Sequence, residues 1–318
     1  MVDHQFLDVR DYGRLKAAME AIQPDFIFHL AAQPIVKRSY RDPLETFEVN
    51  VMGTGNILEV LRTVNLSCVA VFITSDKCYD NVEWIYGYRE NDPVGGKDPY
   101  SGSKGGAELI IKSYFHSFFA SDIDRIRLGV GRAGNVVGGA DWAADRIVPD
   151  CMRSWSKGEA VDIRSPHATR PWQHVLEPLS GYLALGQYLA EELQGDSLNR
   201  QAVHGEAFNF GPDPSQDVTV GELIECMREY WEDCRWNDVS QSDTAGKEAG
   251  LLKLCCDKAL SALSWKACMT FDETVKFTVD WYREYYAQPG QSIRAVTEKQ
   301  LDSYMRLAAD RGLSWIST

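Results

Sequence analysis

The feature that most constrains this chain is a repeated alternation of short apolar runs with longer amphipathic stretches. The runs Asp25–Leu30, Cys68–Thr74 and Ile126–Val130 are rich in aliphatic and aromatic residues, as strands buried on both faces are. Tyr12–Ile22 and Tyr100–Phe119 place their apolar residues at helical spacing. Strands that alternate with helices in this way predict an α/β fold with a doubly wound parallel sheet covered on both faces.

Local signals refine the ends of several elements. Gln5–Leu7 has the pattern of a short strand, and Gln23-Pro24 ends the first helix. Asp42-Pro43 followed by Glu45 is typical of a helix N-terminus, because the aspartate caps and proline fits the first turn. We expect that helix to run to about Val64.

The pattern changes after Gly134, where helices rich in Trp and Tyr follow short strands. We assign residues 1–136 to the sheet domain, to which residues 166–212 return. Residues 137–165 and 213–290 then form a smaller, mainly helical domain, and residues 291–318 a helical tail.

Composition excludes several classes of function. The chain has 318 residues, with 33 Lys and Arg against 46 Asp and Glu, a net charge of −13. Such acidity argues against a nucleic-acid partner, which a basic face usually binds. No apolar run approaches the roughly 20 residues that cross a bilayer, and the N-terminus has no secretory signal, so we expect a cytoplasmic protein without a membrane partner.

The eight cysteines are scattered without the spacing of a metal-binding motif. A zinc site or a disulfide framework is the alternative, but reduced and mostly buried thiols fit a long chain of this composition better. We therefore predict no metal site.

The strongest local signal for chemistry is Tyr100 with Lys104 at the start of a predicted helix. A separation of four residues puts both side chains on one face. A free tyrosine titrates near ~10 and is a poor base at neutral pH, but an ammonium nearby favours the phenolate. An ordinary surface tyrosine and lysine would share this spacing, so the context decides.

That context is the sequence Ser75-Asp76-Lys77, where an apolar strand ends in polar residues. Ligands bind at the carboxyl ends of the strands in open α/β sheets. A strand end with an incidental ion pair is the plainer interpretation. Together with the tyrosine–lysine helix, the three residues indicate a catalytic site.

At these residues the chain resembles the extended short-chain dehydrogenase/reductase superfamily and, within it, the nucleotide-sugar 4,6-dehydratases that act on CDP-glucose. The resemblance covers nearly the whole chain. It rests on the segments 29–34, 74–81, 88–108, 132–150 and 168–183, and on the shorter matches Lys247–Ala249, Asp257–Leu260, Leu263–Trp265 and Trp281-Tyr282.

The resemblance implies a Rossmann-type NAD-binding domain, a nucleotide-sugar domain and a homodimer. It implies an NAD-dependent lyase that takes hydride from C4 of the glucose, eliminates water across C5–C6 and returns the hydride to C6. Tyr100 then matches the base for the 4-hydroxyl, and Ser75 binds the same oxygen. Lys104 matches the residue that activates the tyrosine and holds the nicotinamide ribose, while Asp76 matches the acid that protonates the departing 6-hydroxyl.

Lys77 discriminates most among related enzymes, since those acting on dTDP-glucose carry glutamate there. A protonated lysine cannot accept the C5 proton, so a base role requires a neutral amine in a desolvated site. Stabilisation of an enolate at C4 is the alternative role.

The resemblance also assigns binding residues. Those matched to the cofactor are Asp8, Ala31, Ala32, Gln33, Asn50 and Thr74, in addition to Tyr100 and Lys104. Asn50 is expected to be buried beside the cofactor strand; an exposed helical position is the alternative. For the substrate diphosphate the best candidate is Arg170, since guanidinium binds phosphate bidentately, and Arg146 and Arg132 follow. Asn135 matches a substrate-contacting asparagine of the superfamily.

One segment of the resembled family has no counterpart here. No glycine-rich turn precedes Gln5, although such a turn brings backbone to a pyrophosphate, so we expect the first βαβ unit to be missing and the sheet to be N-terminally incomplete. Its loss would leave an apolar strand edge at Phe26–Leu30. The alternatives are therefore a related nucleotide-sugar epimerase or dehydratase, or a non-catalytic fragment that binds nucleotide or an intact subunit.

Overall fold

The computed structural model describes residues 2–122, 124–195, 201–241, 250–288, 290 and 292–316. The matched segment Lys247–Ala249 lies outside them. In chain order the helices are α1 (Tyr12–Ile22), α2 (Val36–Arg41), α3 (Pro43–Phe47), α4 (Gly53–Thr63), α5 (Pro99–Tyr114), α6 (Ile147–Trp155), α7 (Leu176–Gln194), α8 (Val220–Arg228), α9 (Asp257–Leu263), α10 (Phe271–Ala287) and α11 (Arg294–Asp310).

The main sheet has the strand order β1-β2-β3-β8, formed by β1 (Phe26–His29), β2 (Cys68–Ile73), β3 (Ile126–Ala133) and β8 (Ala207–Phe210). Strands β1, β2 and β3 pair in parallel. The three apolar runs of the sequence are thus the three neighbouring strands, and the prediction of an α/β fold with a parallel sheet is confirmed.

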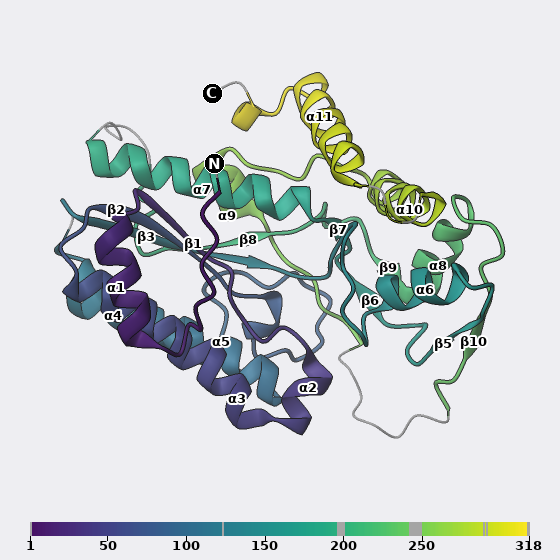
Figure 1. Cartoon of the computed structure of the whole chain (residues 1–318), viewed down its shortest axis with the longest axis horizontal. Coiled ribbons are helices and arrows are strands. Elements are labelled where there is room, and N and C mark those ends of the chain that lie inside the picture. Colours follow the sequence, from purple (N-terminus) through teal and green to yellow (C-terminus); the bar gives the residue numbers. More distant parts are fainter. Residues whose placement is uncertain are drawn as a thin grey trace. The chain divides into compact units, whose positions relative to one another are not determined.

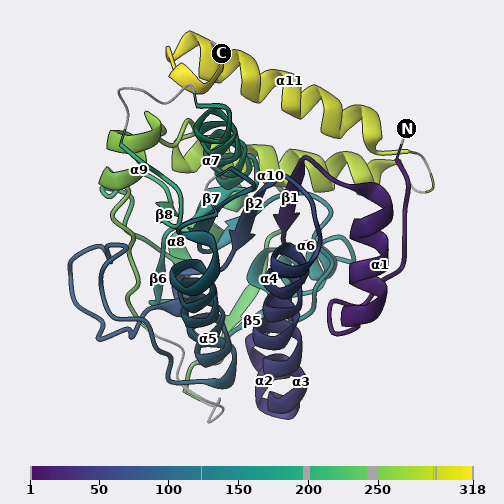
Figure 2. The same ribbon diagram turned by 90° about the vertical axis from the view of Figure 1, so that its left-hand side faces the viewer.

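Helices cover both faces of this sheet, with α4 and α5 on one face and α7 on the other (Figures 1 and 2). The face toward α4 and α5 is packed by Leu58, Phe72, Ile111 and Leu128. On the other face, a Cβ at Gly129 would lie 3.2 Å from Leu185 of α7, so this helix packs directly on the strand.

Helix α3 begins as its sequence predicts. The side chain of Asp42 accepts a hydrogen bond from Glu45 N, and Pro43 occupies the first turn. A π-helical turn, η1 (Glu48–Met52), joins α3 to α4, so one helical path runs to Thr63. Asn50 lies in this turn and is buried.

Strand β1 forms one edge of the described sheet, with its side chains partly open to solvent at Phe26, Ile27 and Phe28. The sequence predicted an uncovered apolar strand at this position. The strand predicted over Gln5–Leu7 was wrong: these residues are irregular, and Phe6 is 82% exposed. An alternating pattern forms a strand only where a neighbouring strand pairs with it, and none lies beside these residues in the described sheet.

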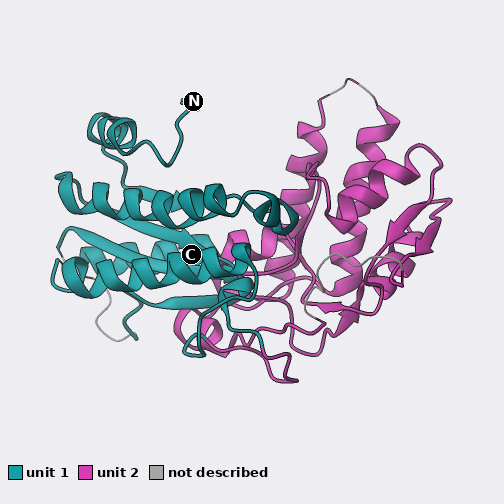
Figure 3. Ribbon diagram, turned by 90° about the horizontal axis from the view of Figure 1, so that it is seen from below, with its two compact units in different colours: residues 1–81, 90–132, 182–209 teal, residues 82–89, 133–181, 210–318 magenta. Residues whose placement is uncertain are grey.

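The chain divides into two compact units (Figure 3). Unit 1 comprises residues 1–81, 90–132 and 182–209, and unit 2 comprises residues 82–89, 133–181 and 210–318. Unit 2 contains three pairs of short strands, which are β4 (Val136–Val137) with β7 (Gln173–His174), β5 (Val161–Ile163) with β10 (Trp236–Asp238), and β6 (Thr169–Arg170) with β9 (Val218–Thr219).

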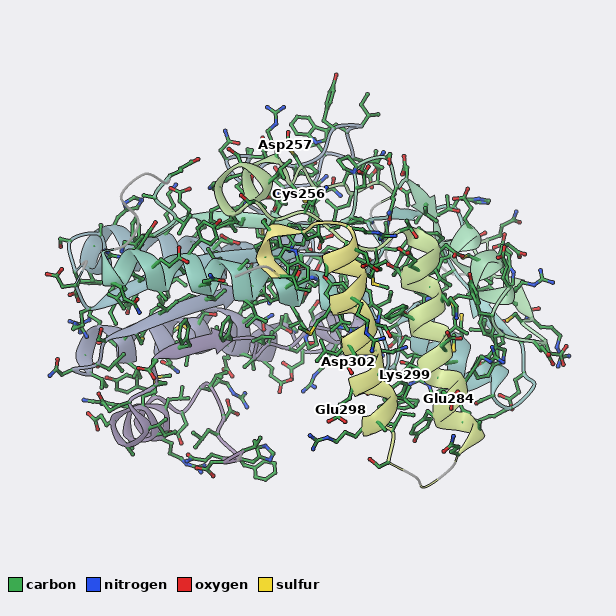
Figure 4. The ribbon with its side chains drawn as sticks, turned by 90° about the horizontal axis from the view of Figure 1, so that it is seen from above. Cys256, Asp257, Glu284, Glu298, Lys299 and Asp302 are labelled. Carbon is green, nitrogen blue, oxygen red and sulfur yellow. The ribbon has the colours of Figure 1, made fainter. Side chains whose placement is uncertain are left out.

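The core of unit 2 is aromatic and sulfur-rich, with Met152, Trp155, Trp281 and Tyr282 buried among aliphatic residues of α6, α8 and α10. Figure 4 shows α11 beside α10, with the charged residues Glu298, Lys299 and Asp302 on α11. Tyr304 anchors α11, because its hydroxyl donates to Glu177 Oε2 of α7 at 3.1 Å. None of the described helices has the length and apolar character needed to span a membrane.

Candidate active site

The first turn of α5 holds the tyrosine and the lysine on one buried face. Asp98 caps the helix, accepting hydrogen bonds from Ser101 N at 2.9 Å and from Ser101 Oγ at 2.6 Å. Tyr100 and Lys104 lie one turn apart and are only 8% and 6% exposed. The alternative of an ordinary surface pair is therefore wrong.

The polar end of β2 brings two further candidates into contact. Ser75 Oγ donates to Asp76 Oδ1 at 2.9 Å and accepts from Lys77 N at 3.2 Å, which caps the short helix η2 (Asp76–Cys78). Ser75 and Asp76 are buried, whereas Lys77 is half-buried. The serine and the aspartate thus form one hydrogen-bonded unit at the carboxyl end of a central strand.

Tyr182 of α7 interacts electrostatically with both Asp76 and Tyr100. Burial raises the pKa of its hydroxyl, and the charges of Asp76 and Tyr100 raise it further, which places all three side chains in one neighbourhood. Tyr182 was not identified as a site residue from the sequence. Its helix is recognisable from the sequence, but that this residue faces the catalytic candidates depends on how α7 packs on the sheet.

Lys104 is the buried cation of this site. Burial lowers its pKa to about 8, an effect opposed by Cys78 and by Glu108, which lies one turn further along α5. The charge of Lys104 also affects His29 at the end of β1. Burial, and to a smaller extent this charge, lower the pKa of His29 to about 4. His29 Nε2 lies 3.1 Å from Thr54 Oγ1, so the ring is neutral and fixed at physiological pH. His29 was also not identified as a site residue from the sequence.

Arg132, a weaker candidate for binding substrate, lies in the core of unit 1 instead. Its Nε donates to Glu108 Oε1 at 2.8 Å and its Nη2 to Glu108 Oε2 at 2.9 Å. The arginine is 4% exposed. A guanidinium held this way has its planar face and both edges committed to protein, so the substrate role predicted for Arg132 is not supported.

The loop after β1 is tied down by Asn50, whose buried position agrees with the sequence interpretation. Asn50 Oδ1 accepts from Gln33 N at 2.8 Å, and Asn50 Nδ2 donates to Gln33 O at 3.1 Å and to Ser103 Oγ at 2.8 Å. Gln33 is itself buried, and its Nε2 donates to Thr46 Oγ1 at 2.9 Å.

These residues suit a dinucleotide. Strands β1 and β2 are neighbours in parallel register, so the loops at 30–33 and 74–77 follow adjacent strands at the same edge. The small side chains of Ala31, which is exposed, and Ala32, which is half-buried, let a ligand approach the backbone. Thr74 is held at the end of β2 by two hydrogen bonds: its backbone N donates to Gly131 O at 2.9 Å, and its Oγ1 donates to Glu108 Oε1 at 2.5 Å.

Asp8 lies apart from this network, exposed on the segment before α1. It forms an ion pair with Arg10 at 2.7 Å, and hydrogen bonds from Arg10 lower its pKa to about 2. A carboxylate that stays ionised in this way suits the hydroxyls of a ribose, but the structure gives it no contact with the loop at 30–33.

The predicted substrate residues belong to unit 2. Arg170 of β6 is 5% exposed, and its Nη1 donates to Thr169 O at 2.7 Å. Arg146 pairs with Asp141 at 3.0 Å and is half-buried. Asn135 has a φ of 48°, a left-handed conformation that asparagine tolerates better than most residues. The structure thus places the catalytic and cofactor candidates in unit 1 and the substrate candidates in unit 2.

Among the described residues, no grouping of His, Cys, Asp and Glu is arranged to hold a metal ion. None of the eight cysteines forms a disulfide bond, and five of them are buried.

Comparisons with known proteins give one coherent group of relatives. Residues 3–197 match the family described as GDP-mannose 4,6 dehydratase. The CDP-glucose 4,6-dehydratase of Salmonella typhimurium is 42% identical over 303 residues, which cover 94% of this chain and 81% of that protein. The CDP-paratose 2-epimerase of Salmonella typhi is 24% identical, over 86% of this chain and 82% of its own length.

Solved structures share the fold. RMD from Pseudomonas aeruginosa, complexed with NADPH, matches with a TM-score of 0.73 and 21% identity, over 89% of both chains. DesIV from Streptomyces venezuelae, a dTDP-glucose 4,6-dehydratase with NAD and TYD bound, matches with a TM-score of 0.71 and 21% identity, over 88% of this chain and 79% of that one.

Proposed function

Because the chain belongs to the GDP-mannose 4,6-dehydratase family, we propose that it is a nucleotide-sugar 4,6-dehydratase, a hydro-lyase that binds NAD and converts CDP-glucose to CDP-4-keto-6-deoxyglucose. The observation that carries the proposal is the 42% identity with the Salmonella enzyme across almost the whole chain. Relatives named for dTDP-glucose, such as that of Streptomyces antibioticus at 26%, are much less similar.

The geometry of unit 1 supports the assignment of catalytic roles. Tyr100 takes the proton of the sugar 4-hydroxyl, and the ammonium of Lys104 one turn away stabilises the phenolate that does so. Ser75 binds the same sugar oxygen, and Asp76 protonates the departing 6-hydroxyl. The hydrogen bond from Ser75 Oγ to Asp76 Oδ1, at 2.9 Å, orients this acid.

NAD, when bound, supplies a centre that accepts the hydride from C4 and returns it to C6. The residues that would hold it are Ala31, Ala32, Gln33 and Thr74 at the ends of β1 and β2, with Lys104 at the nicotinamide ribose and Asp8 toward the adenosine. Asn50 acts indirectly, by fixing the loop that contains Gln33.

In unit 2 we assign the diphosphate of the substrate to Arg170, with Arg146 and Asn135 in supporting roles. A guanidinium matches two phosphate oxygens at once, and a local positive charge is needed because the chain has a net charge of −13. Lys77 has two candidate roles, as the base for the C5 proton or as a cation that stabilises an enolate at C4. Lys77→Met distinguishes them: solvent exchange at C5 is lost in the first case and retained in the second.

We further propose that two copies pair through the outer faces of α3, η1 and α5. Four large apolar side chains are exposed there, namely Leu44, Phe47, Met52 and Leu109. Phe47 lies 3.6 Å from a Cβ placed at Gly102, so α3 and α5 form one continuous surface. A contiguous apolar surface of this kind is typical of a subunit interface. Eight cysteines without a disulfide bond fit a reducing compartment, and we place the enzyme in the cytoplasm.

The experiment uses the purified chain with NAD⁺ and either CDP-glucose or dTDP-glucose, followed by proton NMR. Dehydration converts the C6 hydroxymethyl group of glucose to a methyl group, so a new methyl doublet reports turnover directly. We expect that doublet with CDP-glucose. Preference for dTDP-glucose overturns the nucleotide assignment, and nucleotide binding without any product supports a non-catalytic protein instead.

A further inference from the structure

The buried ion pair between Arg132 and Glu108 in unit 1 has no role in the proposed mechanism. The side chains of Arg132 and Glu108 are 5% and 7% exposed, respectively. Burying two charges is costly, and replacing such a pair by apolar residues is often neutral or stabilising. Stability alone therefore gives little reason for an ion pair at this position.

The pair lies directly beside the proposed catalytic helix face. Tyr100, Lys104 and Glu108 follow one another at intervals of four residues on α5, and all three are buried. Residues at this spacing stack along one side of a helix, so Lys104 lies between the tyrosine and the carboxylate.

The carboxylate of Glu108 is fixed in direction by three hydrogen bonds. Oε1 accepts from Thr74 Oγ1 at 2.5 Å and from Arg132 Nε at 2.8 Å, while Oε2 accepts from Arg132 Nη2 at 2.9 Å. The donors come from the end of β2 and from β3, so the sheet itself holds the carboxylate against α5.

Arg132 is held equally firmly on its far side. Its Nη1 donates to Tyr79 Oη at 2.8 Å and to Glu90 O at 3.1 Å, and Tyr79 Oη donates to Asn209 Oδ1 at 2.7 Å. Burial alone would lower the pKa of Arg132, but the charge of Glu108 and the hydrogen bonds to it, together with smaller contributions from Cys78 and Tyr79, raise it. The guanidinium therefore remains charged beside the Glu108 carboxyl group.

Lys104 needs a negative charge beside it. Its burial favours the neutral amine and lowers its pKa to about 8, whereas the proposed chemistry requires an ammonium beside Tyr100. Of the groups around it, His29 is neutral, and burial raises the pKa of Cys78 far above its usual range, so that thiol is neutral too.

The other charged groups near Lys104 are differently placed. Asp76 and Lys77 of η2 belong to the catalytic group, and Tyr100 is the proposed base. On the helices packed against α5, Glu45, Glu48 and Glu59 form ion pairs with arginines at the surface. Glu108 is the buried carboxylate on the lysine's own helix face.

We propose that Glu108 is a positioning residue: its carboxylate, fixed by Arg132 and Thr74, keeps Lys104 as an ammonium in its buried place, where the ammonium acts on Tyr100. The inference rests on the proposed roles of Lys104 and Tyr100. It adds a row of three side chains along one face of α5, namely the hydroxyl of Tyr100, the ammonium of Lys104 and the carboxylate of Glu108, and Arg132 holds the last of these against the sheet.

The test is Glu108→Gln, which removes the charge and keeps the shape. Lysines labelled with ¹³C at Cε are titrated by NMR, and Lys104 is assigned by the signal lost in Lys104→Met. We expect the midpoint for Lys104 to fall by about one pH unit, so that the ratio of neutral amine to ammonium rises about tenfold at a given pH. The alkaline limb of kcat/KM for CDP-glucose should move down by the same amount.

Three further variants make the result decisive. Glu108→Asp retains the charge and should leave the midpoint close to that of the wild type. Glu59→Gln removes a half-buried glutamate of α4 that is paired with Arg62, and it should leave the midpoint unchanged. If Glu108→Gln does not fold, the double variant Glu108→Gln with Arg132→Met removes both charges. The midpoint should again fall, but by less than in the single variant, because the positive charge of Arg132 disfavours the ammonium and is lost as well.

An unchanged midpoint in folded Glu108→Gln, or in the double variant where only that folds, overturns the positioning role, whatever the enzyme's activity. A shifted midpoint in a protein whose wild type turns over no nucleotide sugar leaves the electrostatic role intact and overturns the proposed function instead. The titration needs no substrate, so the two failures are distinct.

Discussion

The side chain of Asn50 and the backbone of Gln33 form a reciprocal pair of hydrogen bonds: Oδ1 accepts from Gln33 N at 2.8 Å, and Nδ2 donates to Gln33 O at 3.1 Å. A π-helical turn thus fixes, through one side chain, the loop that follows the edge strand β1. Since that loop is a proposed cofactor contact, the order of the loop and the affinity for NAD should depend on the same residue.

Asn50→Leu removes all three side-chain hydrogen bonds of Asn50 and leaves the backbone N–H and C=O of Gln33 without their partner. We expect a loss of about 2–4 kcal/mol in the free energy of unfolding, because an unsatisfied buried group costs about 1–3 kcal/mol. Urea denaturation measures it, and titration with NAD should show weaker binding. Asn237→Ala, at an exposed asparagine of β10, should cost less than about 0.5 kcal/mol.

Lys104→Met should stabilise the protein while abolishing its activity. A pKa of about 8 against an ordinary 10.5 means that the native state disfavours the ammonium by roughly 3 kcal/mol. This penalty is complete below pH 8 and disappears as the pH rises toward 10.5, where the unfolded lysine loses its proton too. The gain from the substitution should therefore be largest at pH 7 and small near pH 10.5.

Urea denaturation of the NAD-free protein at both pH values tests this expectation. Lys112→Met, at an exposed position of the same helix, is the matched control and should not change the stability at either pH. A destabilised Lys104→Met at pH 7 would contradict the assignment of a desolvated charge.

Acidification should destabilise the fold through two histidines. Burial lowers the pKa of both His29 and His174 to about 4, against an ordinary 6.5. Between these values the unfolded chain binds a proton that the native chain does not, so stability falls with the pH by up to about 1.4 kcal/mol per unit for each ring. His174→Gln should reduce the slope between pH 6 and 4, whereas His116→Gln, at an exposed position, should leave it unchanged.

Tyr100→Phe should lower kcat about 10²–10⁴-fold, the usual contribution of a general base, with a much smaller effect on stability. Product formation by NMR and urea denaturation measure the two effects. Tyr114 lies in the last turn of α5, and its hydroxyl donates to Glu59 of α4. Tyr114→Phe removes that hydroxyl and should retain activity. Activity in Tyr100→Phe close to that of the wild type would exclude Tyr100 as the base.

If two copies pair through the proposed surface, charged substitutions on that surface should separate the dimer. Leu44→Glu combined with Leu109→Glu introduces charge at two side chains that are 74% and 58% exposed, and should convert dimers to monomers. Sedimentation analysis measures the mass in solution. Leu260→Glu, on α9 and 52% exposed, is the control that should remain dimeric. A wild-type protein that sediments as a monomer contradicts the pairing.

Hydrophobic periodicity was sufficient for the central elements. The helix predicted over Tyr12–Ile22 has those bounds, and the run Cys68–Thr74 differs from β2 by one residue. Both are long enough for their pattern to be unambiguous. Strand β3 extends three residues beyond the predicted run Ile126–Val130, to Ala133. The added residues include Arg132, whose charge is accommodated in the buried strand by its pairing with Glu108 of α5, a partner that no local pattern specifies.

The site could be predicted where local spacing carries the chemistry. The interval of four residues between Tyr100 and Lys104 determines that they share a helix face. Tyr182 and His29 could not be predicted, because they reach the site only through the packing of α7 on the sheet and through the pairing of β1 with β2. No interval in the sequence specifies either arrangement.

Neither compact unit is a continuous piece of chain, since each is assembled from three segments that alternate along the sequence. During synthesis, therefore, unit 1 cannot complete its fold until residues 182–209 have left the ribosome. By then two segments of unit 2, residues 82–89 and 133–181, have been synthesised before the rest of their unit. The two units therefore cannot fold one after the other during synthesis. Its stability is best regarded as a property that appears late and all at once, which makes the nascent protein a natural client for chaperones.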